Sequence, residues 1–252
     1  MSLGDDLAAI LRGLCPARCP RCGEESPAGF CGECSADFAR VESPCADCGL
    51  PRAGHRCPAG EAWWRLDRVR APFLYTAPLD RYLQRLKYGR ERRLGAALGG
   101  LLAAELARTL AREPAGSDAL ALGRPDRIVA VPLHPCRLRE RSFNQADEIA
   151  RPVAATLGSE HRDCGIRRLR ATRPQTELRR NERLRALADA FGVRGRLDAL
   201  HIAVVDDVMT TGATVNALAA ALKAAGARRV EAWAVARAPG HEDDVDQPAR
   251  NR

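Results

Sequence analysis

Two acidic residues followed by a threonine- and glycine-rich segment form the stretch of this sequence best suited to bind a sugar phosphate. Asp206 and Asp207 directly follow the apolar run 202–205, which predicts a buried strand that ends at Asp206. The next predicted element is a helix from Ala213, closed by Gly226. Amides at a helix N-terminus and threonine hydroxyls can cradle a phosphate, and glycine allows close backbone approach. The two carboxylates can accept hydrogen bonds from a ribose diol and help to hold a hydrated Mg²⁺. The candidate phosphate-binding residues are Thr210, Thr211, Gly212, Ala213 and Thr214.

An arginine-rich segment follows a second predicted strand at 126–131, where it would reach the same edge of the sheet. Parallel sheets bind ligands at the carboxyl ends of their strands. A leaving pyrophosphate needs donors and positive charge, and the forked guanidinium of arginine supplies both. We therefore take Arg137, Arg139 and Arg141 as candidate catalytic residues, together with the two acids. Lys87 could also reach a pyrophosphate, although the sequence alone favours a solvated lysine at the end of a helix.

Eight of the ten cysteines lie before residue 60, and two Cys-x-x-Cys pairs among them predict a structural zinc site. Cysteine pairs of this kind occur in secreted disulfide scaffolds and in metal sites, and the pairing in short turns favours metal. Each turn presents two sulfurs to one ion, so two turns fill a tetrahedral site. The predicted zinc ligands are Cys19, Cys22, Cys31 and Cys34.

A third cysteine turn, Cys45 and Cys48, has an incomplete partner. Cys57 is followed by Gly60 where the second cysteine of a fourth turn would stand, and His55 could supply the missing ligand. Two alternatives remain open: a second zinc ion held by Cys45, Cys48, His55 and Cys57, or a degenerate ribbon with free thiols. The segment has few large apolar residues, so metal binding would supply much of its folding free energy.

The remaining pattern predicts an α/β protein with a parallel sheet behind a small zinc-ribbon module. We expect the module to span residues 1–61, the larger domain residues 62–240, and a disordered tail residues 241–252. Further elements are predicted as strands at 69–75 and 229–236, and as helices at 79–88, 94–112 and 144–157.

Composition restricts the class of protein more than it identifies partners. The N-terminus lacks the basic and apolar regions of a signal peptide, and no apolar run has the length of a membrane span, so we expect a cytoplasmic protein. The net charge of +8 permits nucleic acid or polyphosphate partners. Only Lys87 and Lys223 are lysines, however, so the abundant arginine can also reflect codon bias. The sequence gives no oligomeric state.

Several of these motifs carry a family resemblance. The stretch 204–214 resembles the phosphoribosyl pyrophosphate (PRPP) loop of type I phosphoribosyltransferases. The stretch 131–145 resembles the signature of the ComF family of competence-associated phosphoribosyltransferase-like proteins, as do the cysteine pairs and the segments 86–89 and 173–176. One departure is Ser142, where the family usually has glycine, so that this loop would be less mobile.

The resemblance implies a zinc ribbon fused to a type I phosphoribosyltransferase domain that binds PRPP with Mg²⁺. It also implies a role in handling single-stranded DNA during natural transformation. Two other functions stay open: a salvage phosphoribosyltransferase that acts on a base or amine, and a non-catalytic PRPP-sensing adaptor for a competence helicase or DNA. The arginine-dense segment 162–196 could be a lid over the site or a track for DNA, although Phe191 is its only aromatic residue for base stacking.

Overall fold

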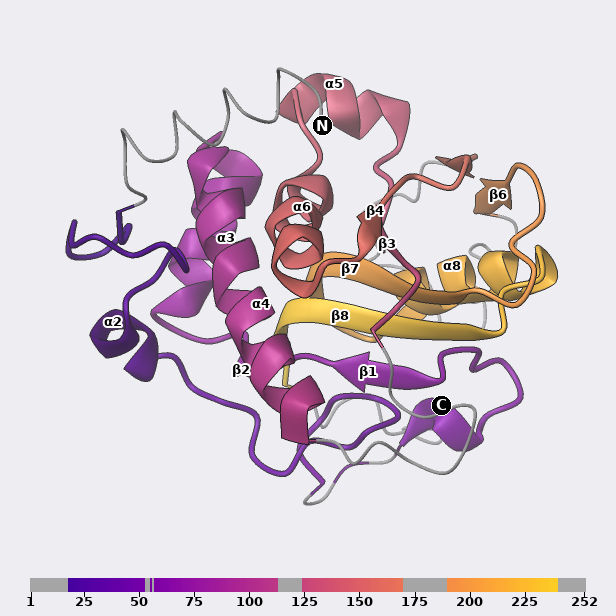
Figure 1. Cartoon of the computed structure of the whole chain (residues 1–252), viewed down its shortest axis with the longest axis horizontal. Coiled ribbons are helices and arrows are strands. Elements are labelled where there is room, and N and C mark those ends of the chain that lie inside the picture. Colours follow the sequence, from indigo (N-terminus) through magenta and orange to yellow (C-terminus); the bar gives the residue numbers. More distant parts are fainter. Residues whose placement is uncertain (1–17, 53–54, 56, 113–123, 170–189, 240–252) are drawn as a thin grey trace, which may run out of the picture.

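A computed structural model describes residues 18–52, 55, 57–112, 124–169 and 190–239 (Figure 1). Cys15, the predicted tail at 241–252 and the motif at 173–176 lie outside these residues, as does most of the arginine-dense segment. The described elements, in chain order, are α2 (Gly32–Ala36), the 3-10 helix η1 (Pro58–Gly60), β1 (Arg68–Arg70), β2 (Phe73–Leu74), α3 (Leu79–Tyr88), α4 (Arg93–Arg112), β3 (Arg127–Ala130), α5 (Pro135–Arg141), α6 (Gln145–Leu157), β4 (Glu160–His161), β5 (Ile166–Arg168), β6 (Phe191–Val193), β7 (His201–Met209), α8 (Ala213–Ala224) and β8 (Arg229–Arg237).

A parallel sheet forms the centre of the molecule. Its strands follow the order β1-β8-β7-β3-β4, and β2 extends β1 along the same side of β8. The central register pairs Val204 with Val129 on one side and with Ala232 on the other. Strands β5 and β6 form a separate antiparallel pair. The predicted α/β class with a parallel sheet is therefore confirmed.

Helices cover both faces of this sheet, which explains why its central strands are apolar at successive positions. Ile128 and Val205 lie in the core that α3, α4 and α6 share, whereas Val129 and Val204 lie in the core under α8. Figure 1 shows α3, α4 and α6 grouped together, with α8 at the other side of β7 and β8. At the carboxyl end of β7, Val208 packs against the first core and Met209 belongs to the second, so both faces of this end are packed.

Three predicted elements differ from the structure. The strand predicted at 69–75 is interrupted between β1 and β2, because Pro72 lacks the amide that a continuous ladder needs. The strand predicted to end at Asp206 continues through both acids to Met209. The arginine-rich segment, predicted as a loop, is the short helix α5, which begins after the cap residue His134. The helices predicted at 79–88, 94–112 and 144–157 are confirmed within one residue at their ends.

The cysteine-rich segment packs directly onto the larger part of the chain. The ring of Phe30 lies 5.0 Å from that of Phe38 and 4.9 Å from that of Tyr82, which belongs to α3. Phe38 also approaches Phe73 of β2 at 6.0 Å. Figure 1 accordingly shows α2 beside α3. These edge-to-face contacts give the small module a core that it shares with α3 and the sheet.

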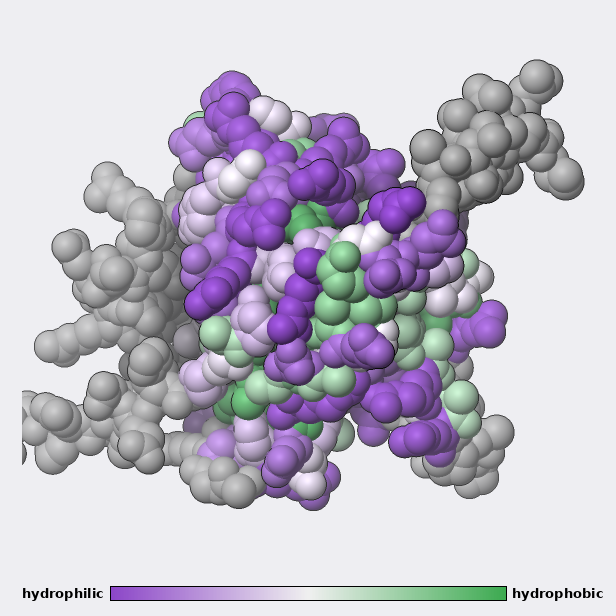
Figure 2. Space-filling model, turned by 90° about the vertical axis from the view of Figure 1, so that its left-hand side faces the viewer, coloured by the Kyte–Doolittle hydropathy of each residue, from purple (hydrophilic) through white to green (hydrophobic). Residues whose placement is uncertain are grey.

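Helix α4 is long and apolar enough to cross a membrane by length and composition alone, contrary to the expectation that no such run exists. In this fold it is a core helix, since 56% of its most apolar window is buried. Leu98 and Leu102 are fully buried in the core that α4 shares with α6. Figure 2 views the molecule from the side on which α2 and α3 lie, and most of the described surface there is hydrophilic.

Glycine allows α4 and α6 to approach closely. A Cβ atom at Gly99 would lie 2.3 Å from Cγ of Pro152 and 2.5 Å from the carbonyl oxygen of Ile149. We expect Gly99→Ala to lower the free energy of unfolding by about 1–3 kcal/mol, because the helices must move apart. Denaturant unfolding followed by circular dichroism measures this change. Gly60→Ala is the matched control, since a Cβ there meets no atom within 4 Å. Equal stability of the two variants would contradict this packing.

Candidate functional site

Strand β7 carries the paired acids at its carboxyl end. Asp207 is only 6% exposed, and Asp206 is partly buried beside it. Burial and the neighbouring Asp207 raise the pKa of Asp206 to about 7, whereas Lys87 and Arg168 oppose the shift. The two carboxyl groups therefore concentrate negative charge at a site that is largely shielded from solvent. A cation or a set of hydroxyl donors brought by a ligand would compensate that charge.

Lys87 lies against these acids, so the expectation of a solvated lysine is wrong. Its Nζ is 3.1 Å from Oδ2 of Asp207, and its side chain is 21% exposed. Burial alone would lower the pKa of Lys87, but the carboxylates of Asp207 and Asp206 outweigh it and raise that pKa. Lys87 stands near the end of α3, far from β7 in the sequence, and the fold places its ammonium group at the acids.

The segment after β7 turns sharply into α8. Thr210 and Thr211 are exposed, and the amide of Ala213 donates to Oγ1 of Thr211 at 3.3 Å. Gly212 has a φ of +80°, and a Cβ atom there would lie 2.5 Å from Cε of Met209. Only glycine therefore suits this position. Thr214 stands in the first turn of α8, where backbone amides and the helix dipole favour an anion.

The three arginines of helix α5 differ in how far they are exposed to solvent. Arg137 and Arg141 are four residues apart on one face of the helix and are partly buried. Nη1 of Arg141 donates to Oε1 of Gln145 at 3.0 Å, and its guanidinium lies 5.4 Å from the ring centroid of Tyr88 at the end of α3. Arg139 is exposed and donates to Sγ of Cys136 within α5 at 3.5 Å. The structure thus brings Arg141 to Tyr88 at the end of α3 and leaves Arg139 on the outside.

Ser142, the residue directly after α5, stands where the family resemblance leads us to expect glycine. Ser142 has a φ of +68°, in the left-handed region that favours glycine. Its amide closes the helix by donating to the carbonyl of Leu138 at 2.8 Å. Serine at this position therefore holds a conformation that glycine would adopt without strain.

Arg168, at the end of β5, belongs to the same area and was not singled out from the sequence. Burial and the nearby charge of Arg137 lower its pKa, whereas Asp206 raises it. Its guanidinium also lies 5.5 Å from the ring centroid of Phe191. The only sequence signal was its place in a segment with many arginines, which does not distinguish Arg168 from its neighbours.

The first cysteine cluster has the geometry of a metal site. The sulfur atoms of Cys19, Cys22, Cys31 and Cys34 all lie within 4.8 Å of one another. Sγ of Cys22 is 3.7 Å from Sγ of Cys31, close to the ~3.8 Å edge of a tetrahedron with ~2.3 Å zinc–sulfur bonds. This donor set fits zinc.

The second cluster includes His55. Sγ of Cys48 is 3.2 Å from Nε2 of His55, and Sγ of Cys45 is 3.7 Å from Sγ of Cys57. All four ligand atoms lie within 4.8 Å of one another. The clustered geometry favours the second-zinc alternative over a degenerate ribbon, and both clusters could bind zinc.

The pKa values of two thiols in the first cluster indicate that a bound cation would stabilise the cluster. Burial raises the pKa of Cys19, but the backbone amides of Cys22, Cys31 and Arg21 outweigh it and lower that pKa to about 6. Burial and the surrounding thiols raise the pKa of Cys34 to about 12. One thiol of the cluster therefore ionises readily, and its negative charge hinders the ionisation of the next thiol. A divalent ion removes this conflict by neutralising the negative charge.

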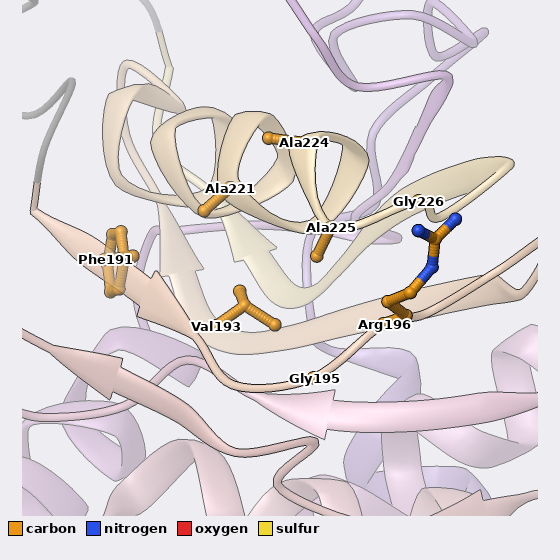
Figure 3. A pocket seen from close by; sticks show the side chains of 8 residues that line it. All are labelled: Phe191, Val193, Gly195, Arg196, Ala221, Ala224, Ala225 and Gly226. Carbon is orange, nitrogen blue, oxygen red and sulfur yellow. The ribbon is translucent and has the colours of Figure 1, made fainter.

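A surface cavity of about 510 Å³ lies away from the acids (Figure 3). Phe191 and Val193 of β6 line one side, Ala221 and Ala224 of α8 line the other, and Arg196 stands at its end. This cavity is beside the C-terminal half of α8, whereas the acids and threonines are at the N-terminal end of that helix. It therefore plays no part in the site described above.

Comparison with known proteins places the chain in a family. It is 38% identical over 215 residues to DNA utilization protein YhgH of Salmonella typhimurium, covering 83% of this chain and 90% of that protein. It is 27% identical to competence protein F of Haemophilus influenzae, covering 83% of this chain and 85% of that protein. Competence protein ComFC of Streptococcus pneumoniae is 26% identical, with coverage of 82% and 87%.

Two other comparisons do not contribute to the family assignment. No protein-family model matches the chain. A purine phosphoribosyltransferase from Pyrococcus horikoshii aligns with a TM-score of 0.30 and 15% identity, covering 62% of this chain and 91% of that one. The sequence relatives, which match over most of their own length, are sufficient: the chain belongs to the ComF family, the family of competence protein F and DNA utilization protein YhgH.

Proposed function

We propose that this protein binds PRPP at the carboxyl edge of β7 and supports the handling of single-stranded DNA in natural transformation. The observation that carries the proposal is the convergence of three features. The paired acids Asp206 and Asp207, the buried ammonium of Lys87 and the N-terminus of α8 meet at one edge of the sheet. Together they offer acceptors for a ribose and donors for two separate phosphate groups.

Each part of PRPP has a matching group in this arrangement. The carboxylates of Asp206 and Asp207 would accept hydrogen bonds from the ribose hydroxyls. The segment 210–214 would bind the 5′-phosphate through its amides and threonine hydroxyls. Lys87, Arg137 and Arg141 would face the pyrophosphate, while Arg139 has the weakest support because it is exposed. The acids are also the residues that would hold Mg²⁺, which neutralises pyrophosphate charge when bound.

If the protein catalyses transfer, the bond between the anomeric carbon and the pyrophosphate oxygen breaks, and a bond to an acceptor nucleophile forms. Pyrophosphate leaves with the electron pair of the broken bond, and positive charge from Lys87, Arg137 and Arg141 would stabilise it. The proton of the acceptor must leave as well, and no described residue is assigned to that step. A salvage transferase and a PRPP-sensing adaptor for a helicase or DNA therefore stay as alternatives.

The cysteine clusters complete the proposed organisation. We propose a zinc-ribbon module at residues 1–61, a phosphoribosyltransferase-like domain at 62–240 and a cytoplasmic location. Both clusters fit structural zinc, since each supplies four protein ligands and leaves no position for a substrate.

Titration of the protein with PRPP and Mg²⁺ in a calorimeter tests the proposal, and release of pyrophosphate in the presence of a panel of bases and amines separates the alternatives. Binding without turnover supports the ComF-type role or the adaptor, and turnover with one acceptor supports salvage. Absence of any PRPP binding would contradict the proposal.

The exposed end of α3 offers a contact surface for single-stranded DNA. Phe191, the only aromatic residue in the sequence of the arginine-dense segment 162–196, is only 6% exposed and is therefore unsuitable for base stacking. Tyr88 is 74% exposed, follows Lys87 directly and lies under the guanidinium of Arg141. An exposed ring among arginines can stack a base and attract the DNA backbone.

We expect Tyr88→Ala to weaken binding of single-stranded DNA by about 5-fold or more, because each stacked base contributes about 1–3 kcal/mol. Fluorescence anisotropy with a labelled oligonucleotide at several salt concentrations measures the change. Tyr88→Trp is the control, and it should keep the affinity because it retains an aromatic face. Equal affinity of Tyr88→Ala and the unaltered protein would remove Tyr88 from the DNA contact.

A further inference from the structure

The side chain of Arg237 joins the second cysteine cluster to the phosphate loop, residues 210–214. Arg237 is the last residue of β8 and is 3% exposed. Its Nε donates to the carbonyl of Cys48 at 3.0 Å. Its Nη1 donates to the carbonyl of Met209 at 2.9 Å and also to that of Thr210, the first residue of the loop. One rigid, planar group therefore touches the backbone of a cluster residue and the backbone of the loop.

The cysteine turn cannot shift without disturbing this connection. Gly49, directly after Cys48, has a φ of +73°, and a Cβ atom there would lie 2.7 Å from Cγ1 of Val69 and 3.7 Å from Cδ of Arg237. The amide of Val69 donates to the carbonyl of Ala46, inside the same turn, at 2.8 Å. The turn is thus packed against both β1 and Arg237.

A second connection runs from the other side of the cluster. After Cys57 the chain reaches Trp63 and Trp64, which pack edge to face with ring centroids 5.4 Å apart. Asn216, in the first turns of α8, donates from Nδ2 to the carbonyl of Trp63 at 2.9 Å and accepts from the amide of Arg65 at 2.6 Å. The ring of Trp64 would also lie 3.2 Å from a Cβ atom at Gly212. Both sides of the cluster therefore contact the loop or the start of α8.

We propose that the second cluster and Arg237 act as a support for the phosphate loop, so that metal bound at this cluster raises the affinity of the loop for a sugar phosphate. A metal ion would tie Cys45 and Cys48 to Cys57 and fix the two segments that lead to the loop. Coupling between two sites is reciprocal, so the sugar phosphate must also raise the affinity of the cluster for metal. Arg237 is a positioning residue in this scheme, since it binds backbone carbonyls and not the ligand. The proposal rests on the proposed PRPP site.

The first cluster provides the matched control. Its surroundings pack on α3 and α4, with Phe30 against Tyr82 and Gly29 against Ala97. It approaches the site only through α3, which carries Lys87, and none of the contacts described above joins it to the phosphate loop. A ligand change in the first cluster should therefore lower PRPP affinity less than a ligand change in the second cluster, as long as the chain stays folded.

The test compares Cys57→Ser with Cys22→Ser in the full-length protein, after circular dichroism has shown that both are folded. We expect Cys57→Ser to weaken PRPP binding by about 5- to 150-fold, the usual range of coupling between sites, and Cys22→Ser to weaken it clearly less. In the unaltered protein, PRPP should slow the removal of one of two zinc ions by a chromogenic chelator. Equal PRPP affinity in the two variants, or chelation unaffected by PRPP, would overturn the proposal.

Arg237→Lys keeps the positive charge but loses the fork, and it covers the case in which a cysteine variant does not fold. It should weaken PRPP binding and reduce the effect of PRPP on zinc removal, and adding Cys57→Ser should then lower PRPP affinity less than the same change does in the unaltered protein, because only the connection through Asn216 remains. Hydrogen exchange at amides 210–213 supplies a readout without PRPP. Faster exchange after chelation supports the coupling, and unchanged exchange would overturn it. If the unaltered protein does not bind PRPP, the proposed function fails, and the exchange measurement still decides whether the metal supports the loop.

Discussion

Asp207→Asn is expected to weaken binding of PRPP by about 30-fold or more. The substitution removes a buried carboxylate that holds Lys87 at 3.1 Å and that we assign to the ribose hydroxyls. Hydrogen bonds to a charged group contribute about 1.5–3 kcal/mol each, and the amide that replaces the carboxylate offers neither a charged acceptor to the ribose hydroxyls nor a charged ligand to Mg²⁺. Isothermal titration of both proteins with PRPP and Mg²⁺ measures the change in dissociation constant.

Asp198→Asn is the matched control for this prediction. Asp198 forms an exposed pair with Arg196 at 2.9 Å, remote from the phosphate loop, so its loss should not change PRPP affinity. A double variant, Lys87→Met with Asp207→Asn, should lose less stability than Asp207→Asn alone, because it leaves no unpaired buried ammonium. If Asp207→Asn binds PRPP as tightly as the control, the acid is not part of the site.

Removal of a zinc ligand from the first cluster should have the largest effect on folding. Cys34 is 8% exposed and lies in the core that Phe30 and Phe38 share with α3. Structural zinc contributes about 10–16 kcal/mol to the folding of small zinc domains at neutral pH. We therefore expect Cys34→Ser to lose one zinc ion per chain and to unfold at a markedly lower temperature.

Elemental analysis for zinc and thermal unfolding measure these two effects. Cys136→Ser is the control, since Cys136 is an exposed cysteine on α5 outside both clusters. It should keep both the zinc content and the unfolding temperature. Unchanged zinc content in Cys34→Ser would show that the first cluster does not hold the metal.

Local patterns predicted most of the fold because they depend on neighbouring residues. The apolar run 202–205 and the helix positions Leu79, Tyr82, Leu83 and Leu86 repeat at the spacing of their elements, and all of them are buried in the structure. The cysteine turns likewise brought ligands together at short sequence distance. The strand boundary at Asp206 was wrong because polarity does not end a strand whose neighbour β8 continues to pair with it.

Contacts between distant segments could not be predicted in the same way. Lys87 is at the end of a helix, where a solvated side chain is the usual outcome, and only the fold brings that end of α3 to Asp207 of β7. Arg237 is at the end of an apolar strand, and only the return of the cysteine turn to β8 gives it the carbonyl of Cys48 as a partner. No residue spacing encodes either contact.

The central claim is that an activated sugar phosphate binds against the turn between β7 and α8. Backbone amide resonances of residues 210–214, recorded by NMR with and without PRPP and Mg²⁺, test it most directly. We predict large shifts at these amides and at Asp206 and Asp207, with little change at the cavity beside Ala224. Shifts confined to that cavity, or none at the turn while PRPP is bound, would contradict the claim.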